Sequence, residues 1–125
     1  MSINVLVVDD SRVMRAMILK SLELAGLPID QTYQATNGKE GLEVLKQHGI
    51  DLVIVDVNMP IMNGEEMLDA MIKTPGLQNI PVLVISTESS VTRTTRLREK
   101  GAAFIHKPFK PETIRDTVKH IMEGK

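Results

Sequence analysis

The sequence contains no cysteine and only three aromatic residues, Tyr33, Phe104 and Phe109. Without cysteine, neither a disulfide framework nor a thiolate metal site can form. Three aromatic side chains are also too few for a base-stacking platform or for the aromatic sandwich that holds a flavin. These absences exclude several classes of binding protein at the outset.

Charge excess and long apolar runs are lacking as well. Fifteen basic against sixteen acidic residues leave a formal net charge of −1, without the basic excess typical of a nucleic-acid binder. The apolar run 5–8 is short and ends in two aspartates, unlike a signal peptide, and no run approaches the roughly 20 residues that cross a bilayer. We therefore expect a cytoplasmic protein that binds neither nucleic acid nor membrane.

Short β-branched runs alternate with longer helical stretches along the 125 residues. The predicted strands are 3–8, 32–36, 51–56, 81–86 and 103–106. The predicted helices are 11–25, 39–47, 65–73, 89–100 and 111–122, and either Asp10 or Ser11 could cap the first. Five βα units predict an α/β fold, namely a flavodoxin-like doubly wound five-stranded parallel sheet of strand order 2-1-3-4-5 with five helices. Because the last helix runs to the end of the sequence, we expect a single domain, residues 1–125, with no effector domain.

Reactive side chains gather where the predicted strands end. Asp9 and Asp10 follow the first strand, Asp56 ends the third, Ser86 ends the fourth, and Lys107 follows the fifth. In an open parallel sheet these ends meet at one edge, where ligands bind. Three carboxylates there should raise a carboxylate pKa or recruit a divalent cation, because like charges about 4 Å apart near a surface repel by roughly 4 kcal/mol. Oxygen ligands are those that Mg²⁺ prefers. Mg²⁺ in turn can neutralise and orient a phosphoryl group. A carboxylate beside the bound Mg²⁺ can then act as a nucleophile and form an aspartyl phosphate.

Four motifs mark these strand ends in order: LVVDDSRVMR, VIVDVNMPIMNG, PVLVISTES and FIHKPF. On them the whole chain resembles the response-regulator receiver family, particularly its stand-alone chemotaxis (CheY-like) type. The resemblance implies that Asp56 accepts a phosphoryl group from a sensor histidine kinase. It also implies that Asp10 binds Mg²⁺ directly and Asp9 through water, with Asp56 and the backbone carbonyl of Asn58 as further ligands.

The resemblance assigns the other strand-end residues as well. Lys107 would contact a phosphoryl oxygen, and the Lys107-Pro108 bond would be cis. Ser86 would reach the phosphate after modification, and Phe104 stands where the family has an aromatic switch residue. Since Phe104 has no hydroxyl group, such a switch must work by packing alone; a simple core aromatic is the alternative.

The same resemblance predicts how the signal is sent and lost. The phosphorylated chain would bind a protein target, in chemotaxis, through the fourth helix, the fifth strand and the fifth helix. The alternative is a phosphorelay intermediate that passes the group to a histidine phosphotransfer protein. Asn58 and Glu88 would tune dephosphorylation, and the chain would catalyse only its own phosphorylation and dephosphorylation, so it is not a conventional enzyme.

The predicted helix 89–100 has only a thin apolar stripe, Val91 and Leu97. Its three threonines lower helix propensity by a few tenths of a kcal/mol each. It is either a solvated charged face or a marginal, mobile element whose position phosphorylation biases.

Two other functions are alternatives to the receiver hypothesis. A phosphohydrolase of the haloacid-dehalogenase type would need D-x-D, but the sequence reads Asp56-Val57-Asn58. A flavodoxin-like electron carrier would place its cofactor phosphate beside Asp9 and Asp10, which would repel it.

Overall fold

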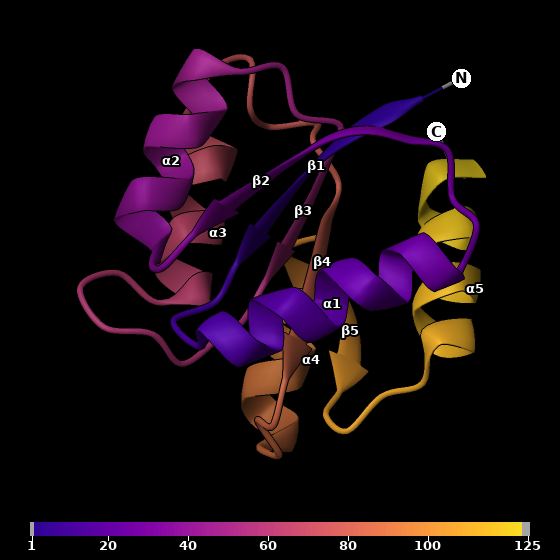
Figure 1. The fold of residues 1–125 in the computed structure, drawn as a ribbon. Helices are drawn as coiled ribbons and strands as arrows, with labels where there is room; N and C mark the ends of the chain where they lie inside the picture. The colour runs from indigo at the N-terminus through magenta and orange to yellow at the C-terminus, as the bar shows by residue number, and fades with distance from the viewer. Residues whose placement is uncertain (1, 124–125) are drawn as a thin grey trace.

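The computed structural model describes residues 2–123, in which five strands and five helices alternate along the chain (Figure 1). The strands are β1 (Ile3–Val8), β2 (Ile29–Ala35), β3 (Leu52–Val55), β4 (Val82–Ser86) and β5 (Ala103–His106). The helices are α1 (Arg12–Leu24), α2 (Gly38–Gln47), α3 (Gly64–Lys73), α4 (Val91–Glu99) and α5 (Pro111–Glu123). None of these helices is long and apolar enough to cross a membrane.

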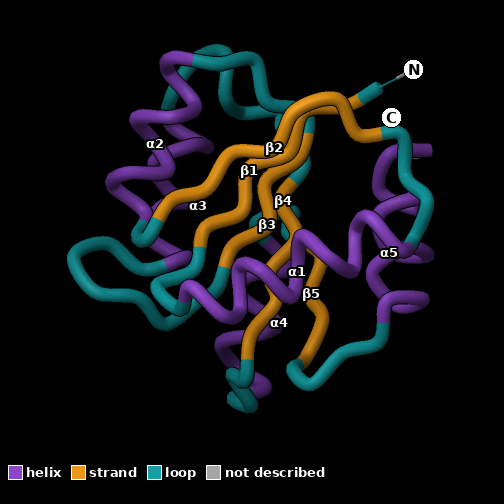
Figure 2. The backbone as a smooth tube through the Cα atoms, viewed as in Figure 1, coloured by secondary structure: helices purple, strands orange, loops and turns teal. Residues whose placement is uncertain are grey.

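The strands form one parallel sheet in the order β2-β1-β3-β4-β5 (Figure 2). The predicted flavodoxin-like α/β fold is therefore confirmed. Because the strands run the same way, their carboxyl ends reach one edge of the sheet. Val8 of β1 and Val55 of β3 are paired there, which brings the residues that follow them close together. That the chain is a single domain without an effector domain stays a prediction.

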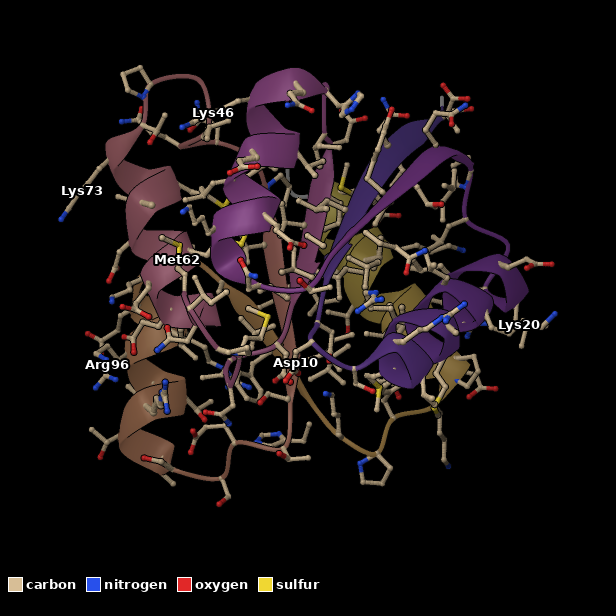
Figure 3. All side chains as sticks on the ribbon, turned by 60° about the vertical axis from the view of Figure 1, so that its left-hand side comes forward. Asp10, Lys20, Lys46, Met62, Lys73 and Arg96 are labelled. Atoms are coloured by element: carbon tan, nitrogen blue, oxygen red, sulfur yellow. The ribbon has the colours of Figure 1, made fainter. Side chains whose placement is uncertain are left out.

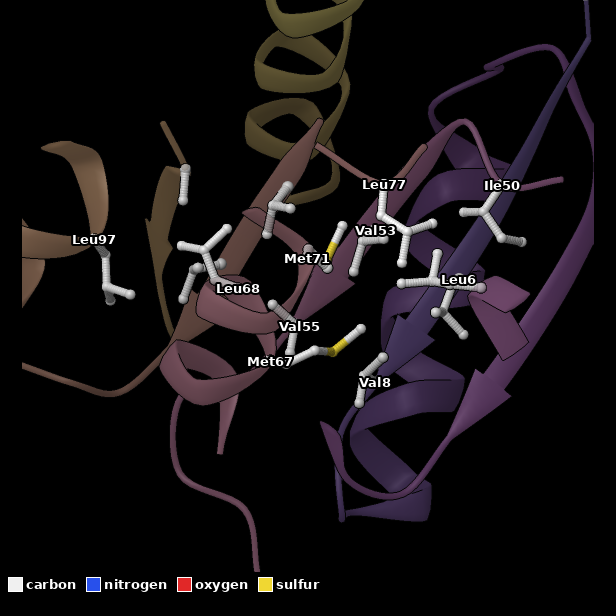
Figure 4. Close-up of a cluster of buried hydrophobic side chains, with 14 of the residues drawn as sticks. Leu6, Val8, Ile50, Val53, Val55, Met67, Leu68, Met71, Leu77 and Leu97 are labelled. Carbon is white, nitrogen blue, oxygen red and sulfur yellow. The ribbon is translucent and has the colours of Figure 1, made fainter. Parts of the chain in front are cut away.

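The sheet separates two hydrophobic cores, because successive side chains of a strand point to opposite faces. In β1, Leu6 and Val8 face one core while Val5 and Val7 face the other. Helices α2, α3 and α4 cover the first core, whereas α1 and α5 cover the second (Figure 1). Figure 4 shows the first core, where Met67 of α3 packs among strand side chains. Cover on both faces explains why the strands are continuous apolar runs.

Side-chain caps define where four helices begin. The caps are Ser11, Asn37, Asn63 and Ser90. The Oγ of Ser11 accepts from the backbone N–H of Met14 at 3.1 Å, so Ser11 rather than Asp10 caps α1. Asn63 forms a reciprocal capping box with Glu66, each side chain accepting from the other's backbone N–H. Such caps contribute about 1 kcal/mol each and fix the position of the first turn.

Two element boundaries differ by more than one residue from the sequence prediction. Strand β2 begins at Ile29 rather than residue 32, because pairing with Ile3 of β1 recruits a polar segment. It lies at the sheet edge, where residues 30–32 are exposed polar side chains that carry no apolar signal. Helix α4 begins at Val91 rather than residue 89, since Ser90 is its cap.

Helix α3 approaches the end of β3 at a glycine. A Cβ added to Gly64 would lie 2.2 Å from the backbone oxygen of Asp56. The Gly64 N–H donates to the carbonyl oxygen of Val57 at 2.9 Å. Any larger residue would push the first turn of α3 away from the end of the strand.

We expect Gly64→Ala to lower the free energy of unfolding by about 1–3 kcal/mol, the usual cost of overpacking a fixed backbone contact. Urea denaturation followed by circular dichroism measures this change. Gly49→Ala is the matched control, because a Cβ there meets nothing within 4 Å. Its effect should stay within about 0.5 kcal/mol. Equal stability of the two variants would contradict the role given to Gly64.

Candidate functional site

The residues predicted to carry the chemistry come together at the carboxyl edge of the sheet. Asp9 follows β1, Asp56 follows β3, Ser86 ends β4 and Lys107 follows β5. Backbone bonds hold them in place: Asp56 N–H donates to Val8 at 3.0 Å, and Lys107 N–H donates to Ser86 at 2.9 Å. Figure 3 shows Asp10 at the same edge.

Three carboxylates converge there. One oxygen each from Asp9, Asp10 and Asp56 lies within 4.8 Å of the other two. The Nζ of Lys107 lies 3.1 Å from Asp9 Oδ2 and 3.2 Å from Asp56 Oδ2, donating to both. A single ammonium therefore neutralises part of a threefold negative charge, and the Lys107-Pro108 bond that follows it is cis, as the resemblance implies.

The electrostatic cost falls mainly on Asp9. Its side chain is only 1% exposed, and this burial raises the pKa of Asp9 above its usual value. The nearby Asp56 charge acts in the same direction. A hydrogen bond from the Ser11 N–H at 2.8 Å and the contact with Lys107 oppose the rise. Asp10 is exposed, so the two neighbouring aspartates have different environments.

Asp56 is held from two sides. Its Oδ1 accepts from the N–H of Val57 at 2.7 Å, and its Oδ2 accepts from Lys107. The side chain keeps 12% of its surface exposed, so one carboxylate in the cluster is both oriented and open to solvent. That combination suits a group that must meet a partner from outside.

The donor set fits a hard divalent cation. All the available ligands are carboxylate oxygens, and their negative charge exceeds what Lys107 supplies. Mg²⁺ prefers oxygen ligands and binds through one or two carboxylates, keeping several waters. Asn58 lies two residues after Asp56 and is exposed, and the role of its carbonyl stays a prediction.

Ser86 and Glu88 are linked rather than independent. Ser86 is fully buried, and its Oγ accepts from the N–H of Glu88 at 3.2 Å. The Glu88 carboxylate accepts from the N–H of Ser90 at 3.1 Å and from Arg93 Nη1 at 3.0 Å. The Glu88 carboxylate is thus tied to α4, and its predicted role in tuning dephosphorylation stays a prediction.

Phe104 lies in the same hydrophobic core as Leu97 of α4. Its ring is tilted against that of His106, with the centroids 4.6 Å apart. Phe104 and the buried residue of α4 therefore share one hydrophobic core. That Phe104 acts as a switch stays a prediction.

Arg15 is a site residue that the sequence reasoning missed. Its Nη1 donates to the backbone oxygen of Asp9 at 2.7 Å, and its Nε donates to Gln34 at 2.9 Å. It ties α1 and β2 to the peptide that carries a central carboxylate. The sequence feature that could have identified Arg15 is its position one helical turn after the Ser11 cap, close to Asp9 and Asp10.

The response regulator receiver domain family matches residues 5–119 of the chain. The chemotaxis protein CheY-3 of Vibrio cholerae is 32% identical over 123 residues, which cover 98% of this chain and 93% of that protein. The sensor histidine kinase CheAY of Helicobacter pylori is 38% identical over 120 residues, and the match spans only 14% of that kinase.

Solved structures agree with the sequence comparison. The chemotaxis protein CheY4 of Vibrio cholerae superposes with a TM-score of 0.85 at 33% identity, covering 97% of this chain and 99% of that one. The signal receiver domain of a signal transduction histidine kinase from Syntrophus aciditrophicus gives 0.85 at 32% identity, covering 98% and 92%. With its fold, its strand-end acids and these relatives in agreement, the chain belongs to the response regulator receiver domain family of two-component systems and is CheY-like.

Proposed function

We propose that this chain is a response regulator that accepts a phosphoryl group on Asp56 from the phosphohistidine of a sensor histidine kinase, with Mg²⁺ bound beside it. The observation that carries the proposal is the contact of one Lys107 ammonium with two members of a three-carboxylate cluster. Membership of the receiver family supports the same conclusion.

The metal would be held by the carboxylates of Asp9, Asp10 and Asp56 and by the backbone carbonyl of Asn58. When bound, Mg²⁺ supplies positive charge that neutralises and orients the phosphoryl oxygens. Lys107 supplies a second positive charge from the residue that follows β5. Together these groups would turn a repulsive cluster into a site complementary to a phosphoryl group.

The chemistry at Asp56 is a direct displacement. A carboxylate oxygen of Asp56 attacks phosphorus in line with the bond to the kinase imidazole, so that a P–O bond forms as the P–N bond breaks. The imidazole leaves with the electron pair. Lys107 then contacts a phosphoryl oxygen, and the hydroxyl of Ser86 turns toward another. The chain would act only on itself in this way and is not a conventional enzyme.

The output would be a change in the surface formed by α4, β5 and α5, which binds a protein target. The match to a chemotaxis protein over nearly its full length supports a role in chemotaxis. Phe104 and Leu97 belong to one core, so packing connects β5 with α4 without any hydroxyl group. A cytoplasmic location, without nucleic acid or membrane as partner, belongs to the same proposal.

Acetyl phosphate with Mg²⁺ should add one phosphoryl group to Asp56, because this carboxylate is oriented and accessible. Intact-mass spectrometry should show a gain of about 80 Da, the mass of one phosphoryl group. Asp56→Asn should remove the gain, since an amide is no nucleophile here. Equal labelling of the variant under the same conditions would place the phosphoacceptor elsewhere.

Metal binding should relieve the repulsion among the carboxylates. Mg²⁺ at ten times its dissociation constant should stabilise the fold by about 1.4 kcal/mol through mass action. Asp9→Asn should raise the melting temperature of the metal-free protein, because it removes a buried charge, and should weaken the response to Mg²⁺, because it removes a ligand.

Asp10→Asn is the comparison for that experiment. It removes the same charge from an exposed position, so the metal-free protein should gain less stability while metal binding still weakens. Thermal melts with and without Mg²⁺ measure both effects. A parent protein whose melting ignores Mg²⁺ would rule out this account.

The aspartyl phosphate should last roughly seconds to a few minutes, because neither Asn58 nor Glu88 is a bulky apolar plug against in-line attack by water. Asn58→Met and Glu88→Leu should both slow the decay. Phosphate release is followed after loading Asp56 and removing the donor. A parent half-life of hours, or variants that lose phosphate as fast as the parent, would overturn this expectation.

A further inference from the structure

Helix α4 has little apolar attachment to the rest of the fold. Leu97 is its buried residue, whereas Val91 is 79% exposed. A helix with one buried side chain and several threonines is not stabilised by packing alone. Other interactions must therefore set its position.

A cluster of charges between α3 and α4 supplies such interactions. Glu65, the second residue of α3, accepts from Nε of Arg96 and, at 2.7 Å, from Nη2 of the same guanidinium. Lys100, just beyond α4, donates to Glu65 at 2.9 Å and lies 2.8 Å from Asp69. Figure 3 shows Arg96 where α4 approaches α3. The two helices are thus joined by charge-assisted hydrogen bonds, the strongest kind available at a surface.

Glu65 is well placed to hold these cations. Its side chain is only 12% exposed. The hydrogen bonds from Arg96 hold the pKa of Glu65 at about 2, against the effect of burial, and Lys100 adds to the lowering. The carboxylate therefore remains charged at any physiological pH, so salt and motion, not protonation, control the contact.

Arg93 extends the network to the β4–α4 loop. Its Nη1 donates to Glu88, while its Nε lies 3.8 Å from Glu65 and has no hydrogen-bond partner within residues 2–123. One guanidinium thus lies between two carboxylates. Glu88 in turn donates its N–H to Ser86 Oγ, so the network reaches the hydroxyl beside the candidate phosphoacceptor site.

The other end of the network also reaches that site. Glu65 follows Gly64, whose N–H bonds the carbonyl of Val57 next to Asp56. Movement of Ser86 toward a phosphoryl group must displace the Glu88 loop. That displacement would pull on Arg93 and hence on Glu65, which follows the glycine bonded to Val57.

We propose that Glu65 is a positioning residue, an electrostatic latch that holds α4 and, through Arg93, the Glu88 loop in the unphosphorylated arrangement. The latch is a property of the fold, and its effect on Asp56 rests on the proposed function. Phosphorylation must supply the free energy of the conformational change that it drives. Weakening the latch therefore lowers the free energy that the rearrangement of α4 requires.

The test compares Glu65→Gln with Glu112→Gln. Glu112 is the second residue of α5, as Glu65 is of α3, but it forms no ion pair among the described residues. Hydrogen exchange of the α4 amides is read by mass spectrometry. Coupling within such networks corresponds to roughly 2- to 100-fold in an equilibrium, and we expect about tenfold faster α4 exchange in Glu65→Gln. The hydrogen exchange of the β1 amides should be unchanged in Glu65→Gln. In Glu112→Gln, the α4 amides should exchange as fast as in the parent.

Salt gives an independent reading. Raising the salt from about 0.1 M to 1 M shortens the screening length from about 10 Å to 3 Å. We therefore expect α4 exchange to accelerate more in the parent than in Glu65→Gln, which keeps only the ion pairs Lys100–Asp69 and Arg93–Glu88 around α4 among the described residues. Glu65→Asp, which keeps the charge on a shorter stem, should remain salt-sensitive. If Glu65 acted only through packing, the rate of α4 exchange in the parent would not depend on the salt concentration.

A second pair of variants tests the latch from the side of α4, so that the test remains decisive if Glu65→Gln does not fold. Arg96 is 49% exposed, so Arg96→Leu should fold, and it should accelerate α4 exchange as Glu65→Gln does. Arg98→Leu removes an exposed cation of the same helix that has no ion pair in the part of the chain that the structure describes, and should have no effect. The double variant Glu65→Gln/Arg96→Leu should exchange no faster than Glu65→Gln alone, because the Glu65 change already removes the contact with Arg96.

Labelling of Asp56 by acetyl phosphate completes the test. We expect it to be several-fold faster in Glu65→Gln. Unchanged α4 exchange overturns the latch. Faster exchange with unchanged labelling, in a parent that is labelled, overturns the link to the phosphoacceptor. If the parent itself takes no label, the proposed function fails, whereas faster, salt-dependent exchange still supports the latch.

Discussion

One ammonium group among three carboxylates sets the conditions for the whole sheet edge. Lys107 lies within hydrogen-bonding distance of Asp9 and Asp56, so both charges have a partner. Unpaired, two carboxylates about 4 Å apart would repel by roughly 4 kcal/mol. The force that assembles them is hydrophobic, because Val8 and Val55, which directly precede the two aspartates, are paired in register on central buried strands. Burial of apolar strands thus brings the acids together, and Lys107 limits the cost.

The two sides of the site are held by different forces. Asp9 and Asp56 follow central strands that are covered by helices on both faces, so they move only if the core moves. Ser86 also ends a buried strand, but the loop after it contains Glu88, whose carboxylate accepts from Arg93 of α4. Both of these side chains are partly exposed to solvent. Local stability follows buried contacts, so the loop and α4 can rearrange while the acids stay in place. A rigid reacting group beside a movable sensing loop is what a switch driven by covalent modification needs.

The sequence predicted the sheet, its strand order and the meeting of the acids at one edge. Buried parallel strands are legible as apolar runs, and strand ends in a parallel sheet share an edge whatever the details. Three features had no such signal. The burial of Asp9 but not Asp10 depends on local packing around the strand end. The positive φ of Ile61, at 69°, is an unfavourable conformation for a β-branched residue that no local pattern announces. The contact of Glu65 with Arg96 joins side chains 31 residues apart, and it exists only once α3 and α4 are both in place.

The latch nevertheless follows from constraints that act on consecutive residues. Asn63 determines where α3 begins through its capping box, and Gly64 determines how closely the helix approaches the carbonyl of Asp56. The backbone of Glu65 is therefore fixed before its side chain finds any partner, and the cations of α4 must come to it. Changes among those cations can alter how firmly α4 is held without moving the proposed phosphoacceptor. Two chains with the same strand-end residues can thus react alike at aspartate and still differ in how readily α4 responds. The proposed chemistry would thus depend on the residues at the sheet edge, and the ease of the proposed switch would depend on the charges on α3 and α4.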